Sequence, residues 1–97
     1  MSQYVAIIED AGPNRAVGVW FPDLPGCFSA GDSLDEAVSN ASSAVTLYAE
    51  VLEEAGEVLP PPRSLSDLKR DPDFLSDIRD HMVALIAVPE RISSAAE

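Results

Sequence analysis

The stretch FPDLPGCFSAGDSLDEA, residues 21–37, decides how this chain folds. It contains two prolines, two glycines, four carboxylates and the only cysteine of the chain. Pro25-Gly26 is a turn dipeptide, because proline presets its own φ and glycine accepts a positive φ. Ser33 can cap the first amides of a helix, and Glu36 can reach back to the Ser33 amide. The stretch therefore predicts a corner that leads into a short strand over residues 27–30 and then into a helix.

The residues after this corner predict one long helix over residues 34–55. Its apolar side chains recur three and four residues apart, as on one buried helical stripe. These positions are 34, 37, 38, 41, 45, 48, 52 and 55. Gly56 stands where a helix commonly takes its C-terminal cap.

The residues before the corner predict two strands, over residues 4–8 and 16–21. The turn cluster between them favours an antiparallel hairpin. Alternation along the second strand places Val17 and Val19 on one face with Phe21, and Trp20 on the other face.

The last third of the chain predicts a connector, two short helical segments and a final strand. Residues 58–62 include three consecutive prolines and cannot continue a helix. The helical segments lie within residues 64–69 and 71–77. Residues 81–88 are apolar with little alternation, which indicates burial on both faces or a strand shared with another subunit.

Together these elements predict an α+β fold in the order β-β-β-α-(short helices)-β. One mainly antiparallel sheet carries the long helix across one face, and residues 1–89 form the single domain. The second face of the sheet has little in the chain to cover it, and Trp20 is a candidate to lie there. We therefore expect a homo-oligomer, either a dimer or a tetramer.

The composition limits the partners of this domain. The chain has 97 residues and a formal net charge of −11, so nucleic acid and anionic membranes repel it. Residues 1–62 hold ten carboxylates and one arginine. A basic protein partner fits this charge, and a cytoplasmic location is the expectation. A single cysteine excludes an internal disulfide and a multi-cysteine zinc site.

Two catalytic interpretations of these residues compete with structural ones. A metal-dependent nuclease needs several converging carboxylates, for which the supply is Glu9, Asp10, Asp23, Asp32, Asp35 and Glu36. Each of these also suits a turn or a helix start. A nucleophilic Cys27 activated by His81 is the second interpretation, although a buried cysteine is more often structural. The residues alone predict an acidic interaction domain without catalytic residues, metal or cofactor.

Residues 21–37, followed by Asn40-Ala41, closely resemble the HicB antitoxin family, and the likeness covers nearly all of residues 3–89. The resemblance implies a partial ribonuclease H-like unit without catalytic activity. It also implies a partner, a small HicA-type toxin that cleaves mRNA with a catalytic histidine on a double-stranded-RNA-binding-like fold. The antitoxin would bind this toxin and cover its active site.

The resemblance also raises the question of a C-terminal DNA-binding domain. Many relatives carry a further C-terminal DNA-binding domain, whereas here only a tail, residues 90–97, follows the last strand. We therefore expect no direct nucleic acid binding by this chain alone, whether the domain is lacking or the chain is a fragment. The expected toxin contacts are Pro22, Asp23, Leu24, Pro25, Gly26, Asp32, Asp35 and Glu36. The alternatives are a stand-alone interaction domain with another partner and a residual metal-dependent nuclease.

Overall fold

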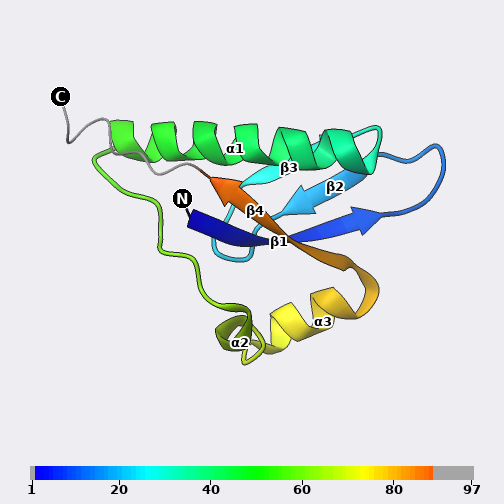
Figure 1. Ribbon diagram of the computed structural model, residues 1–97. Helices are drawn as coiled ribbons and strands as arrows, with labels where there is room; N and C mark the ends of the chain where they lie inside the picture. Colours follow the sequence, from blue (N-terminus) through cyan, green and yellow to red (C-terminus); the bar gives the residue numbers. More distant parts are fainter. Residues whose placement is uncertain (1, 89–97) are drawn as a thin grey trace.

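The computed structural model describes residues 2–88, and they form a four-stranded sheet between helices (Figure 1). The strands are β1 (Ser2–Asp10), β2 (Val17–Trp20), β3 (Phe28–Gly31) and β4 (Met82–Val88). The helices are α1 (Leu34–Glu54), α2 (Leu65–Leu68) and α3 (Pro72–Asp80). The predicted fold class and element order are confirmed. The predicted tail, residues 90–97, lies outside the described residues.

The sheet has the order β3-β2-β1-β4, and every neighbouring pair is antiparallel. β1 is longer than the predicted strand because β4 pairs with it from Ser2 to Ile8, while β2 pairs with it from Ile7 to Asp10. β3 begins at Phe28, one residue later than predicted, because the Cys27 amide closes the preceding turn onto the Leu24 carbonyl.

Local signals set both ends of α1. The Ser33 hydroxyl accepts a hydrogen bond from the Glu36 amide at 3.1 Å, as predicted. The Glu36 carboxylate, however, accepts from the Asp32 amide and not from the predicted Ser33 amide. At the other end, the amides of Gly56 and Glu57 donate back to the carbonyls of Glu53 and Leu52. This pair of bonds is a Schellman motif and ends the helix where the sequence predicts.

The main core lies between α1 and one face of the sheet. The helix contributes a stripe of small side chains, Ala37, Ala41 and Val45, all fully buried. The alternate residues of β1 and β2 pack against this stripe, among them Tyr4 and Val19. Small residues on the helix let it approach the sheet closely, so the positions of β3 and of the corner before it are fixed by α1.

The second face of the sheet is partly covered, which corrects the sequence-based expectation. Leu68 of α2 and Phe74 of α3 are buried against Val5 and Ile7 of β1, with Trp20 at the side. The short helices therefore form a third layer below the sheet (Figure 1). Trp20 lies on this face, as predicted.

The prediction that the last strand is buried on both faces is wrong. β4 is an edge strand, and three of its apolar residues are exposed: Met82 at 44%, Val83 at 39% and Leu85 at 61%. Its lack of alternation therefore reflects an edge that carries apolar side chains on its exposed positions. None of the helices within residues 2–88 combines the length and the apolar character that crossing a membrane requires.

Candidate functional site

The predicted corner consists of two consecutive turns between β2 and β3. The Leu24 amide donates to the Phe21 carbonyl at 3.1 Å, and the Cys27 amide donates to the Leu24 carbonyl at 3.0 Å. Gly26 has a φ of 83°, as the Pro-Gly signal predicts. The Tyr48 hydroxyl of α1 donates to the Pro25 carbonyl at 2.8 Å. The corner is thus a fixed protrusion and is tied to the long helix.

Asp23 holds the corner to the connector between α1 and α2. Its carboxylate accepts a hydrogen bond from the Arg63 amide at 2.8 Å and pairs with the Arg63 guanidinium at 2.5 Å. Only 6% of the Asp23 side chain is exposed, so its carboxylate faces the connector and not the solvent. Nearby, the Tyr4 hydroxyl donates to the Pro60 carbonyl at 2.6 Å. Burial raises the pKa of Tyr4, and the negative charge of Asp23 raises it further.

A groove of about 360 Å³ opens between this corner and α3, and we call it the acidic groove. Four predicted residues line it on the corner side: Pro22, Leu24, Pro25 and Gly26. Leu24 is fully buried and serves as core at its base. The groove also receives aromatic surface from Trp20 and from Phe28, which is 69% exposed. This combination gives the groove an apolar floor.

The opposite wall of the acidic groove carries three carboxylates that sequence reasoning missed as contact candidates, Asp71, Asp73 and Asp77. Asp71 also caps α3 by accepting from the Asp73 amide at 2.9 Å. Arg63 is the one basic residue in the lining; it is paired with Asp23, and its guanidinium also lies 4.0 Å from the Asp71 carboxylate. The signal available in the sequence was the four-residue spacing of Asp73 and Asp77, which places both on one side of a helix.

The remaining predicted contacts lie apart from the acidic groove. Asp32, Asp35 and Glu36 are exposed around the start of α1, which follows the end of β3 opposite to the corner. One of them acts locally, since the Glu36 carboxylate accepts a hydrogen bond from the Asp32 backbone amide. Asp35 lines a different groove, between α1 and β4. The structure therefore divides the predicted site into two separate acidic regions.

The catalytic interpretations gain no support from the geometry. Cys27 is buried in the core under α1, and burial raises the pKa of its thiol. His81 packs edge-on against Trp20, with ring centroids 5.4 Å apart, and Trp20 belongs to the cluster on the opposite face. Within residues 2–88, histidine, cysteine and carboxylate side chains do not gather in threes that could hold a metal ion.

Comparisons with known proteins agree on one family. Residues 4–96 match the model of the HicB_like antitoxin of bacterial toxin-antitoxin systems. An uncharacterized 14.9 kDa protein in the rep-hol intergenic region of Haemophilus phage HP1 (strain HP1c1) is 35% identical over 85 residues. That similarity covers 88% of this chain and 59% of the phage protein, so the chain spans under two thirds of that relative.

Solved structures give the same result. A chain of the HicA3 and HicB3 toxin-antitoxin complex superposes with a TM-score of 0.70 at 25% identity, covering 91% of this chain and 99% of that one. The Burkholderia pseudomallei antitoxin HicB gives a TM-score of 0.72 at 26% identity, covering 96% of this chain and 74% of that one. The family match spans nearly the whole sequence, and the protein therefore belongs to the HicB-like antitoxins of bacterial toxin-antitoxin systems.

Proposed function

We propose that this antitoxin binds a HicA-like, RNA-cleaving toxin through the acidic groove and neutralises it by covering its active site. The observation that carries this proposal is the lining of the groove. Three carboxylates face an apolar floor with an exposed Phe28, and the one lining cation is already ion-paired. A protein that binds RNA needs a basic surface, which would meet these carboxylates.

The two parts of the groove have different tasks in this proposal. Carboxylates at a rim speed and orient the encounter with a basic partner more than they fix affinity. An exposed aromatic side chain beside an apolar floor is the type of group that supplies binding energy once water is excluded. The protein needs no chemistry of its own for this role, and it would act in the cytoplasm, where mRNA is available to the toxin.

Titration of RNA cleavage tests the proposal. The full chain is purified with a candidate HicA-like toxin, and cleavage by the toxin is followed at rising antitoxin ratio. We expect cleavage to reach zero near a fixed stoichiometry. Cleavage that continues unchanged, without a complex, would assign the fold to another protein partner. RNA cleavage by the antitoxin alone, lost on Asp10→Asn, would favour the nuclease alternative.

Charge reversal locates the contact surface. The variant Asp73→Lys/Asp77→Lys should weaken toxin binding by about tenfold to a hundredfold, since attraction becomes repulsion. Asp35→Lys tests the second acidic region, and Glu54→Lys/Glu57→Lys, at two exposed positions, is the control for net charge. Toxin binding that is unaltered by the Asp73/Asp77 change and lost with Asp35→Lys would move the contact to the start of α1.

A further inference from the structure

The two walls of the acidic groove belong to different parts of the hydrophobic core. On the corner side, Leu24 and Cys27 belong to the buried cluster beneath α1. On the α3 side, Phe74 is the buried residue of the helix, and it belongs to the cluster on the opposite face of the sheet. Neither of these clusters within residues 2–88 includes both walls. Apolar packing therefore leaves the distance between the corner and α3 weakly fixed.

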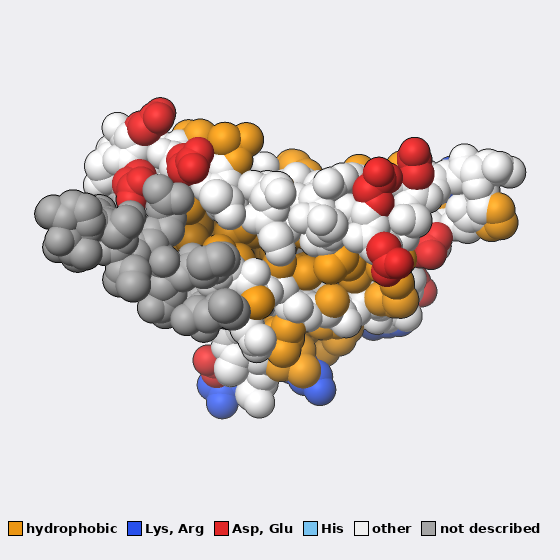
Figure 2. Space-filling model, turned by 45° about the horizontal axis from the view of Figure 1, so that its top comes forward, with side chains coloured by type: hydrophobic (Ala, Val, Ile, Leu, Met, Phe, Trp, Pro, Cys, Tyr) orange, Lys and Arg blue, Asp and Glu red, His pale blue; other side chains and the backbone are white. Residues whose placement is uncertain are grey.

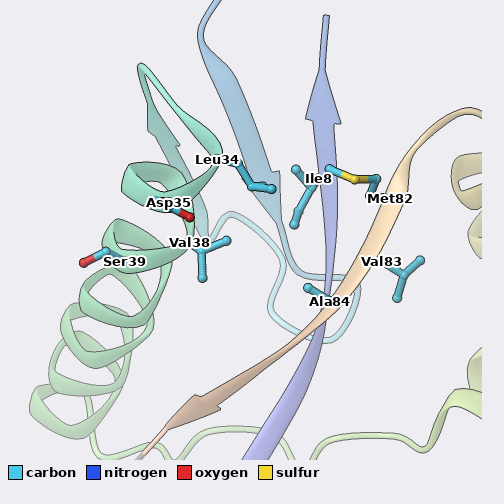
Figure 3. A pocket seen from close by; sticks show the side chains of 8 residues that line it. All are labelled: Ile8, Leu34, Asp35, Val38, Ser39, Met82, Val83 and Ala84. Atoms are coloured by element: carbon cyan, nitrogen blue, oxygen red, sulfur yellow. The ribbon is translucent and has the colours of Figure 1, made fainter.

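The groove between α1 and β4, of about 480 Å³, is built differently. Leu34 and Val38 point from α1 toward the strands that form its other side (Figure 3). Ile8 belongs to the cluster beneath α1, and Val38 and Ala84 pack against that same cluster. Seen from the side of α1, hydrophobic side chains form a strip below the helix (Figure 2). One continuous core thus sets the width of this groove, whereas the acidic groove needs a polar contact between its walls.

Arg63 provides that contact, because it reaches both walls of the acidic groove. Its amide donates to one Asp23 carboxylate oxygen at 2.8 Å, and its Nε pairs with the other oxygen at 2.5 Å. Its Nη1 lies 4.0 Å from Asp71 Oδ2. The second oxygen of Asp71, Oδ1, accepts from the Asp73 amide and caps α3. One guanidinium therefore extends from the corner to the residue at which α3 begins.

The same guanidinium lies between carboxylates that repel one another. Asp23 belongs to the corner, and the α3 wall carries Asp71, Asp73 and Asp77. Without the charge of Arg63, the carboxylates of Asp23 and Asp71 would push α3 away from the corner. The two contacts of Arg63 differ in strength. The Asp23 side chain is 6% exposed, whereas that of Asp71 is 37% exposed and open to screening by salt.

We infer that Arg63 is a positioning residue that holds α3 at the distance from the corner at which the groove fits the toxin, an inference that rests on the proposed function. A guanidinium is a planar fork that can reach two carboxylates at once, whereas a lysine ammonium is a point charge. A wall held in place before binding loses less freedom when the toxin arrives. Arg63 should therefore slow the dissociation of the toxin.

Hydrogen exchange in the free protein tests this role. Arg63→Lys keeps the net charge, and its ammonium should stay with Asp23, because a buried carboxylate without a partner is costly. Asp71 then loses its partner, and α3, a helix of nine residues, is unstable once it detaches. The Leu75 amide, which donates to the Asp71 carbonyl, should exchange about two- to fivefold faster, the range of one exposed ion pair. Acrylamide should also quench Trp20, the only tryptophan and part of the groove lining, more strongly.

Matched variants separate this contact from other effects. Asp71→Asn removes the charge but keeps a good helix cap, and it should accelerate the exchange of the Leu75 amide to a similar extent. The double variant Arg63→Lys/Asp71→Asn should exchange no faster than either single variant, because both remove the same contact. Arg70→Lys is the control, since Arg70 is exposed and lies outside the groove lining. It should behave as wild type.

Toxin binding gives the second measurement. Arg63→Lys should raise the dissociation rate of the toxin about two- to fivefold and leave the association rate unchanged, since the net charge is the same. Exchange and quenching equal to wild type would overturn the proposal, because Arg63 would then hold only the corner. Faster exchange with an unchanged dissociation rate would also overturn it. Toxin binding that is absent even in wild type would overturn the proposed function, and exchange and quenching would still decide whether Arg63 positions α3.

Discussion

At the scale of single residues, Asp23 has a structural role that the sequence did not indicate. It was one of the predicted toxin contacts, yet it is enclosed and holds Arg63 by both the backbone amide and the guanidinium. A carboxylate with two donors 40 residues away in the chain is a structural clamp. Its effect on toxin binding would then follow from its effect on the shape of the corner.

Replacing this clamp residue should lower stability. Asp23→Ala leaves the Arg63 amide and guanidinium without their acceptor, which should cost about 1 to 3 kcal/mol. Urea denaturation of both forms measures the difference. Asp32→Ala, at an exposed position, is the control and should change the free energy of unfolding by less than about 0.5 kcal/mol. Equal values for the two variants would show that the clamp contributes nothing.

One buried hydroxyl, of Tyr4, and one buried thiol, of Cys27, should make the folded state less stable at alkaline pH. The pKa values of Cys27 and Tyr4 are raised in the folded state, both mainly by burial. Groups of this type stabilise the fold below their unfolded pKa values, which are near 9.0 for Cys27 and 10.0 for Tyr4, and this contribution is lost as the pH rises through the folded values. The free energy of unfolding should therefore fall above pH 9.0.

The variants separate the two groups. Cys27→Ala should remove the part of the alkaline loss that begins at lower pH. Tyr4→Phe should remove the later part and should also be less stable at neutral pH, because its hydrogen bond to Pro60 is gone. Denaturation curves recorded from neutral pH upward measure both effects. A wild-type stability that stays level through pH 10.0 would contradict the assignment.

At the scale of secondary-structure elements, β3 and α1 approach each other tightly at Gly31. A Cβ atom built on Gly31 would lie 2.5 Å from the Ala37 amide nitrogen and 2.9 Å from the Glu36 carbonyl carbon. Both are backbone atoms of the first helical turn, so the helix would have to move. The absence of a side chain at Gly31 therefore lets α1 begin directly above the end of β3.

Gly31→Ala should destabilise the protein by about 1 to 3 kcal/mol, since it overpacks this junction. Gly18→Ala is the matched control, because a Cβ atom at Gly18 would meet nothing within 4 Å. In a strand this change should be neutral or stabilising by up to about 1 kcal/mol. Thermal unfolding of the two variants gives the comparison, and equal melting temperatures would argue against a tight junction.

The elements differ in how far the sequence predicts them, and the reason is the range of their signals. α1 was predicted almost to the residue because its caps and its apolar stripe are local patterns. The cover on the second sheet face was missed because α2 and α3 each contribute one buried residue, Leu68 and Phe74. A single apolar residue in a short polar segment carries no periodic signal. The exposure of β4 was missed for a related reason, because composition does not tell an edge strand from a central one.

At the scale of the whole molecule, one part of the candidate site could be predicted from local sequence signals and the other part could not. The corner was predicted because turn residues act on their immediate neighbours. The acidic groove was not, since it forms only when α3 folds back beside the corner, far away in the sequence. The family match supplies the function that neither pattern nor geometry states alone.

The net charge gives a prediction for the complete complex. If the acidic groove meets a basic toxin, the association rate should fall steeply with salt, by about tenfold or more on going from low to molar ionic strength. Stopped-flow mixing of the two proteins measures this rate. Asp73→Lys/Asp77→Lys should flatten the salt dependence, whereas Phe28→Ala should raise the dissociation rate and leave the slope unchanged. A rate independent of salt would contradict electrostatic steering.

The pairing of β1 with β4 has a consequence for how this domain folds during translation. β1 is translated well before its partner β4, and its register runs from Ser2 opposite Val88 to Ile8 opposite Met82. Until residue 88 has been synthesised, a nascent chain holds β1 with one side unpaired and cannot complete its sheet. The fold of this domain is therefore complete only once β4 has been translated, and a product that stops before β4 should be more open to proteolysis.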